Sequence, residues 1–246
     1  MGINAVFELI KNKQLVPFLK LNRMFTPFYR LGYIAALVNN GYFQALKENP
    51  ASLDELMTTM GIEKEHGEGL KAWLQVGIRL NEVNLKDGRY RLGGISKGLA
   101  GVAGNDALLA LTEEVATLHH NLILSTPAKL KEGRKWTIRD QDGMLIARSS
   151  RILESLQNEV IDTVVPRGKS IRLLEVGCGS GIYIKRAAMR NPQLKAVGVE
   201  LQASVAEMAR QNVEKWGLQE QVTIESGDIR EKHFENSFVG GNHTRL

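Results

Sequence analysis

A short apolar segment that runs directly into three alternating glycines constrains this 246-residue chain more than any other feature. The segment reads Ile171-Arg-Leu-Leu-Glu-Val-Gly-Cys-Gly-Ser-Gly181. Its apolar first half is typical of a buried strand, and the glycines permit a tight turn in which a ligand can approach bare backbone. We therefore expect a strand that gives way to a helix through a ligand-binding turn.

The chain after Gly168 alternates between predicted strands and helices. The strands are predicted at 171–176, 195–200 and 222–225, and the helices at 182–190 and 203–216. Such a run predicts a parallel sheet with right-handed crossovers, and ligands of these sheets lie outside the carboxyl ends of the strands. Glu200 ends the second strand and Gly227-Asp228 follows the third, so both acids are expected beside the glycine turn.

The residues around the glycine turn separate the possible ligand classes. A dinucleotide fingerprint would place its third glycine at position 182, where Ile182 stands, and no Gly-Lys-Ser or Gly-Lys-Thr follows to make a P-loop. Glu175 lies two residues before the first glycine, which suits a ligand with a positive end and disfavours pyrophosphate. Glu200 is suited to the hydroxyls of a ribose and Asp228 to the exocyclic amine of adenine. The alternative is structural: the glycines serve only the turn, and the two acids cap helices.

The N-terminal part of the chain is predicted to be mainly helical. Residues 1–30 carry aromatic and basic side chains interrupted by Pro17 and Pro27, so we expect two short amphipathic helices. We favour packing against a partner subunit over a helix that lies on a membrane surface, because the prolines cut the apolar face short. A helix is predicted over 31–46. Ser52-Leu-Asp-Glu55 is a capping box that begins another, which ends at Gly61.

A third helix over 70–80 precedes a hairpin about Asp87-Gly88, and three helices with a hairpin predict a winged helix. The net charge of +5 and the pI near 9.3 raise the possibility of nucleic-acid binding. The groove helix of a DNA reader should be clearly cationic, yet 63–80 holds three acidic and three basic residues. We therefore favour a scaffold or dimerisation role, and keep a DNA-binding regulator with a nucleoside-sensing half-domain as the alternative.

The predicted fold class is α/β, with a mainly helical N-terminal domain and an incomplete parallel sheet. We expect an N-terminal helical arm over 1–30, a winged-helix domain with a helical extension over 31–150, and a partial nucleoside-binding domain over 151–246. The extension is a helix over 106–131, and 138–143 is expected to be a loop.

No run reaches the ~18 apolar residues that a membrane span needs. The single cysteine, Cys178, excludes a disulfide framework and a multi-cysteine zinc site, so we expect a cytoplasmic protein without a metal.

The sequence resembles the S-adenosylmethionine-dependent methyltransferases with a seven-strand Rossmann-like domain. The residues that carry the resemblance are Glu175-Val-Gly-Cys-Gly-Ser-Gly181, Glu200 and Gly227-Asp228. A second resemblance, to the dimerisation domain of small-molecule O-methyltransferases, is found in segments 37–46, 52–56, 88–92 and 127–133. The resemblance implies S-adenosyl-L-methionine as cofactor, a small-molecule methyl acceptor and a homodimer. It implies cofactor-binding roles for Glu175, Gly177, Gly179, Gly181, Glu200, Leu201, Asp228 and Ile229.

The family's domain has further strands beyond the three predicted here, and its catalytic base, usually a histidine, comes from beyond the fourth. We expect no further strand–helix pair after Asp228, so the chain is interpreted as a truncated form of a longer methyltransferase. The strand 171–176 would then be an unprotected edge, which is an aggregation hazard. His233 and His243 lie in the C-terminal tail, and neither is assigned as the base. The catalytic residue is therefore left unassigned.

Overall fold

The computed structural model describes residues 3–234 and 239–242, and its contacts divide the chain into two compact units. The first unit contains Met1–Asn105 and Val115–His119, and the second contains Asp106–Glu114 and His120–Leu246. This division assigns most of 106–131 to the second unit, whereas the predicted boundary lies at residue 150. The three predicted domains stay a prediction.

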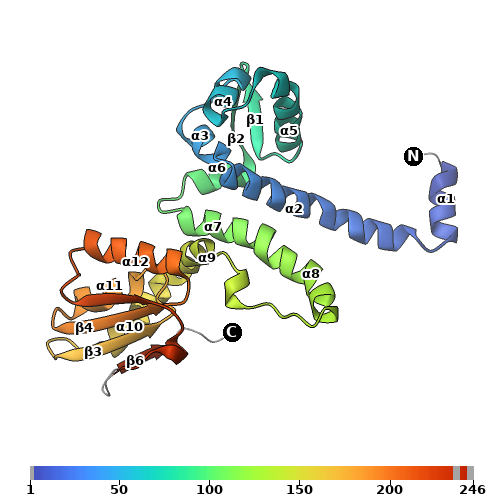
Figure 1. The fold of residues 1–246 in the computed structure, drawn as a ribbon. Helices are drawn as coiled ribbons and strands as arrows, with labels where there is room; N and C mark the ends of the chain where they lie inside the picture. Colours follow the sequence, from blue (N-terminus) through green and yellow to red (C-terminus); the bar gives the residue numbers. More distant parts are fainter. Residues whose placement is uncertain (1–2, 235–238, 243–246) are drawn as a thin grey trace. The chain divides into compact units, whose positions relative to one another are not determined.

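The first unit contains the helices and the hairpin labelled α1 to α6, β1 and β2 in Figure 1, together with a π-helical segment. Its elements are α1 (Ile3–Lys11), α2 (Leu15–Asn39), α3 (Tyr42–Glu48), α4 (Leu53–Met60), η1 (Lys64–His66), α5 (Gly67–Arg79), β1 (Val83–Lys86), β2 (Arg89–Leu92), α6 (Gly94–Ala100) and the π segment η2 (Val115–His119). The capping box at Ser52 and the left-handed stop at Gly61 are confirmed. The hairpin is confirmed as well, with Asp87 and Gly88 at φ of 54° and 72°.

Two predictions for the N-terminal helices are wrong. Instead of two short helices over 1–30, α2 runs without interruption from Leu15 to Asn39 and includes both prolines. Pro17 lies in the first turn, where its missing N–H would have no intrahelical partner, and the helix tolerates Pro27 in its interior. The helix expected over 31–46 is split, because Gly41 adopts φ 79° and separates α2 from α3.

A buried carboxylate organises the end of the first unit. Glu82, fully buried, accepts hydrogen bonds from the Ser96 amide and hydroxyl, both at 2.7 Å, and forms an ion pair with Arg30. A buried charge is stable only when it is paired and hydrogen-bonded, and these contacts join α2 and α6 to the turn between α5 and β1. The sequence pattern gave no sign of this arrangement.

The second unit holds the parallel sheet. Its elements are α7 (Asp106–Glu114), α8 (His120–Lys131), η3 (Ile138–Asp140), α9 (Gly143–Ser149), η4 (Ser150–Leu153), α10 (Glu154–Val164), β3 (Ile171–Val176), α11 (Ile182–Arg190), β4 (Leu194–Glu200), α12 (Ala203–Lys215), β5 (Val222–Ser226), η5 (Ile229–Glu231) and β6 (Val239–Asn242). The predicted helix over 106–131 is interrupted by η2, and the expected loop over 138–143 contains η3 and the start of α9.

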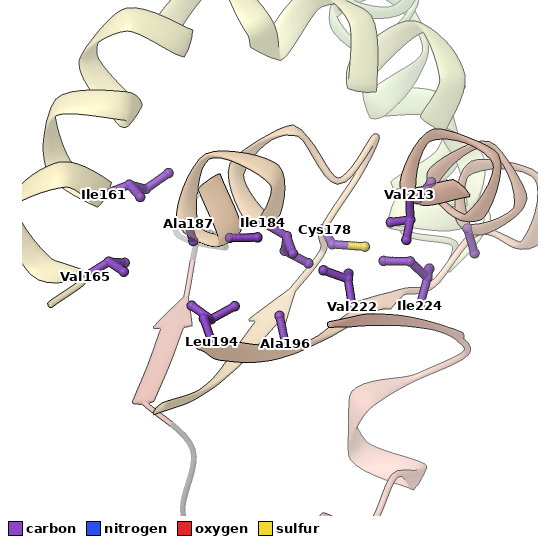
Figure 2. Packing of buried hydrophobic residues seen from close by; sticks show 13 residues of the cluster. Ile161, Val165, Cys178, Ile184, Ala187, Leu194, Ala196, Val213, Val222 and Ile224 are labelled. Carbon is purple, nitrogen blue, oxygen red and sulfur yellow. The ribbon is translucent and has the colours of Figure 1, made fainter. Parts of the chain in front are cut away.

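The predicted β-α-β-α-β run is confirmed, and its helices pack on one face of the sheet. Side chains from α10, α11 and α12 meet alternate residues of β4 and β5 in one apolar cluster, shown in Figure 2. The fully buried Ile184 lies at its centre, between Leu194 and Ala196 of β4 and Ile224 of β5. This core holds the carboxyl ends of the strands in fixed positions.

The expectation that β3 would be an unprotected edge is wrong. The sheet order is β5-β4-β3-β6, and β6 pairs with β3 in parallel, from Leu173 opposite Val239 to Val176 opposite Asn242. The pairing satisfies backbone groups of β3 that would otherwise be open to another chain. Among the described helices, none is both long and apolar enough to cross a membrane.

Candidate functional site

Backbone hydrogen bonds bring the three predicted strand ends together at one edge of the sheet. The Gly177 amide donates to the Val199 carbonyl at 2.8 Å, which joins the glycine turn to the end of β4. The Gly227 amide donates to the Glu200 carbonyl at 2.9 Å, which joins the end of β5 to β4. The glycine turn, Glu200 and Asp228 are therefore neighbours, as the parallel pattern predicts.

The glycine turn has a backbone that other residues rarely adopt. Gly177, Gly179 and Gly181 have φ of 72°, 53° and 77°, all in the left-handed region. Gly181 is the N-cap of α11 and donates its amide to the Cys178 carbonyl at 2.8 Å. A side chain at any of the three positions would be strained, so the turn presents bare backbone at the edge of the sheet.

Glu175 is the most unusual group at this edge. Its side chain is 4% exposed, and neither carboxylate oxygen has a hydrogen-bond partner among the described residues. Burial raises the pKa of Glu175 to about 8, and the nearby charge of Glu200 adds to the shift. A buried carboxyl without a partner is costly, and such groups often mark a binding site for a missing partner.

Glu200 is half-buried and faces the glycine turn. Its Oε2 accepts a hydrogen bond from the Gly179 amide, and its Oε1 accepts one from the Gln202 amide, both at 3.1 Å. Each carboxylate oxygen has two lone pairs, so both retain a position for a further donor. The carboxylate is thus held in one orientation and remains able to accept from a ligand.

Asp228 caps the short helix η5 and forms an ion pair with Arg230. Its Oδ1 accepts from the Arg230 amide and from Nε, both at 3.0 Å. The hydrogen bonds from Arg230 lower the pKa of Asp228 to about 2. A ligand amine at Asp228 would therefore share an ionised carboxylate with the guanidinium.

The remaining predicted positions lie directly beside these acids. Leu201 follows β4 and Ile229 begins η5, and both are half-buried. Cys178 is buried among apolar side chains, and this burial raises the pKa of its thiol, which favours a packing role over nucleophilic chemistry. His233 is exposed, and His243 lies outside the described residues.

Sequence reasoning missed a segment that borders the same edge. We call residues 138–143, which contain η3 and the first residue of α9, the strap. Arg139 of the strap lies close enough to Asp228 for its charge to lower the pKa of that carboxyl. The Ala147 methyl of α9 lies 3.8 Å from the position of a Cβ on Gly179. The signals that could have been recognised are two caps: Thr137 with Asp140 at η3, and Asp142, which accepts from the Leu145 amide at 3.1 Å.

One group of side chains elsewhere has the composition of a metal site. Glu63, Glu65 and His66 place possible ligand atoms within 4.8 Å of one another at the start of α5, and all three are exposed. Exposed acidic groups are common at helix starts, where the helix dipole favours them. We assign no metal to this group.

Two comparisons of sequence found known proteins that are similar to this chain, one of them over the glycine turn and the strands beside it. Residues 173–240 match the family described as "Methyltransferase domain". A tRNA1(Val) (adenine(37)-N6)-methyltransferase of Yersinia pestis is 38% identical over 68 residues. This match covers 27% of the present chain and 27% of the relative, so the chain spans about a quarter of the curated relatives that it matches.

The fold of most of the chain is found in solved O-methyltransferases. Mitomycin 7-O-methyltransferase MmcR superimposes with a TM-score of 0.68 at 16% identity, over 92% of this chain and 70% of that one. Human N-acetylserotonin methyltransferase in complex with SAM gives a TM-score of 0.58 at 15% identity, over 90% and 68%. The α/β fold predicted from the sequence is confirmed by these likenesses.

Proposed function

We propose that this chain, which carries a methyltransferase domain in the fold of the O-methyltransferases, is an S-adenosylmethionine-dependent methyltransferase that acts on an oxygen of a small molecule. The observation that carries the proposal is Glu175. Its buried carboxyl has no hydrogen-bond partner in the described part of the chain and lies at the glycine turn, where a ligand with a positive group would supply one. Dinucleotides place a pyrophosphate at this position, which a neighbouring carboxylate would repel.

The residues at the edge fit the chemistry of this cofactor. Gly177, Gly179 and Gly181 have a positive φ, which favours glycine, and glycine has no side chain to occupy the space beside the turn. The methionine and ribose portions of the cofactor would lie in that space. Glu175 would bind the ammonium group and Glu200 the ribose hydroxyls, while Asp228 would bind the adenine amine. Leu201 and Ile229 would contact the adenosine portion. When bound, the cofactor supplies a methyl group on a positively charged sulfur.

The contribution of the protein to methyl transfer is mainly positional. The hydrogen bonds from Gly179 and Gln202 fix the Glu200 carboxylate before a ligand arrives, so little ordering is required on binding. Holding two reactants in line at near-contact distance can supply about 7–11 kcal/mol of a barrier. We assign no catalytic base to the described residues.

We further propose that the chain forms a homodimer through α1 and α2. Apolar side chains of these helices are exposed in the single chain: Phe7, Phe18, Leu21, Met24, Phe25 and Phe28. Several large apolar side chains exposed on neighbouring elements of the sequence are typical of a protein–protein interface. Light scattering during gel filtration measures the mass, and a monomer at micromolar concentration would contradict this proposal.

A cytoplasmic location remains a proposal that rests on the single buried cysteine.

The DNA-binding alternative is not supported by the comparisons. The family whose model matches residues 173–240 and the two solved structures described above are methyltransferases. The mixed charge of η1 and α5 is also unfavourable for binding in a DNA groove.

Calorimetry with S-adenosylhomocysteine tests the cofactor. The wild type should bind, and Glu200→Ala should bind about 10- to 100-fold more weakly, because hydrogen bonds to a charged group contribute about 1.5–3 kcal/mol. Glu214→Ala, an exposed carboxylate of α12, is the matched control and should bind like the wild type. Absence of binding by the wild type would overturn the proposed cofactor. Equal binding by wild type and Glu200→Ala would remove the role of Glu200.

Transfer of a labelled methyl group to a panel of small phenols measures the O-directed activity.

A further inference from the structure

Gln202 uses every hydrogen-bonding group of its side-chain amide to hold the strap. Its Oε1 accepts from the Gly143 amide at 3.1 Å, and its Nε2 donates to the Ile138 and Gln141 carbonyls, each also at 3.1 Å. These partners lie 59 to 64 residues away in the sequence. One side chain therefore joins the end of β4 to both ends of the strap.

The contact between Gln202 and the strap is too close for a side chain at position 143. A Cβ on Gly143 would lie 2.3 Å from Oε1 of Gln202 and 2.8 Å from a methyl carbon of Val205. Glycine at this position thus allows the backbone to approach the amide directly. The strap is also held between its ends, where Lys129 bonds Asp140 at 3.2 Å.

The strap and the helix that follows it border every part of the proposed adenosine site. Gln202 donates its own amide to Glu200, Arg139 acts electrostatically on Asp228, and Ala147 lies against the glycine turn. In contrast, the charge that acts on Glu175 comes from Glu200 and not from the strap. The strap therefore borders the side of the site where the ribose and adenine would bind.

We infer that Gln202 is a positioning residue that holds the strap as a wall of the adenosine site, and so sets affinity for the adenosine portion of the ligand. This inference rests on the proposed function. Without the amide of Gln202, the strap loses three hydrogen bonds and the Ile138 and Gln141 carbonyls lose their donor. The strap should then move away from Glu200 and Asp228, and the ligand would have to order it again on binding.

The test compares two ligands and two readouts. Adenosine contains the ribose and adenine but lacks the amino acid portion of S-adenosylhomocysteine. Gln202→Ala should weaken the binding of both ligands by the same factor, about tenfold or more. Glu175→Gln should weaken only S-adenosylhomocysteine. A general loss of structure would not separate the two variants in this way. Hydrogen exchange of the empty protein should be faster over 138–143 in Gln202→Ala.

Two further variants make the result decisive. Gln202→Met keeps the size of the side chain without its amide, so it should show the weakened binding and faster exchange expected of Gln202→Ala. It provides the test on its own if Gln202→Ala does not fold. Gln193→Ala removes an exposed glutamine outside the site and should match the wild type. The inference is overturned if the Gln202 variants bind adenosine as the wild type does, or if exchange over 138–143 is unchanged. If the wild type binds neither ligand, the proposed function itself fails.

Discussion

The carboxyl of Glu175 makes the stability of the empty protein depend on pH. Its pKa is about 8 in the folded chain, against an ordinary value of 4.5. Between these values the unfolded chain is ionised while the folded chain still holds the proton, so unfolding releases a proton and stability falls as pH rises. The stability of the folded chain that depends on the proton of Glu175 is fully present below about pH 4.5 and is lost as pH rises through about 8.

Replacing Glu175 with glutamine should remove this pH dependence. The free energy of unfolding of the wild type should fall, relative to Glu175→Gln, by about 2 kcal/mol between pH 6 and pH 8, since one pKa unit corresponds to about 1.4 kcal/mol. Urea denaturation of both proteins at the two pH values measures the difference. Curves that stay parallel across this range would show that Glu175 is already ionised at pH 6.

The same group should couple ligand binding to proton release. Glu175 is mostly protonated in the empty protein at pH 7, and an ammonium group beside it would favour the ionised form. Binding of S-adenosylhomocysteine should therefore release roughly one proton at pH 7, and affinity should rise with pH up to about 8. Calorimetry in two buffers of different ionisation enthalpy counts the protons. Glu175→Gln should release none, and a wild type that also releases none would rule out the coupling.

Single residues were predictable from the sequence where a motif fixed both type and spacing. Glu175, Glu200 and Asp228 were each found at the end of a predicted strand, because parallel strands end at the same edge. That no described residue bonds the Glu175 carboxyl was not predictable, since this depends on every group that surrounds it. Gln202 was missed because its strap partners are distant in sequence and are mainly backbone atoms.

At the scale of elements, the packing of α11 on the sheet depends on a glycine inside β4. A Cβ on Gly198 would lie 2.7 Å from Ile184, 2.8 Å from Ile224 and 2.9 Å from Cys178. Gly198→Ala should therefore destabilise the second unit by about 1–3 kcal/mol, the usual cost of overfilling a core. Chemical denaturation followed by circular dichroism measures the effect.

A second glycine provides the control for this prediction. Gly69 lies in α5, and a Cβ there would meet nothing within 4 Å. Gly69→Ala should stabilise the protein by about 0.5–1 kcal/mol, because alanine favours the helix. If Gly198→Ala were as stable as the wild type, the side chains around Gly198 would have to pack more loosely than the structure indicates.

Elements were predictable where their signals were local. The capping box at Ser52 and the hairpin at Asp87-Gly88 depend on a few adjacent residues and were confirmed. The strand β6 was missed because its sequence, Val-Gly-Gly-Asn, contains residues that are rare in strands. It forms by pairing with β3, more than sixty residues earlier in the chain, and only tertiary structure supplies that contact.

At the scale of the whole molecule, the fold class was predictable because alternating strands and helices leave few possible topologies. The division into two units was less accessible. The sequence predicts a helix over 106–131, but it does not predict α9 and does not show which core these helices join. In the structure α7 and α9 pack together in the second unit, and Arg148 of α9 bonds Asp106 of α7.

Two units with separate cores should respond differently to the ligand. All eight predicted cofactor positions belong to the second unit, whereas Leu37, Leu56 and Leu74 form part of the core of the first. A ligand at 100 times its dissociation constant stabilises the form that binds it by about 2.7 kcal/mol. S-adenosylhomocysteine should therefore slow hydrogen exchange in β3, β4 and β5 and leave α4 and α5 unchanged. Equal slowing in both units would mean that they open as one, and the ligand would then stabilise the whole chain through its second unit.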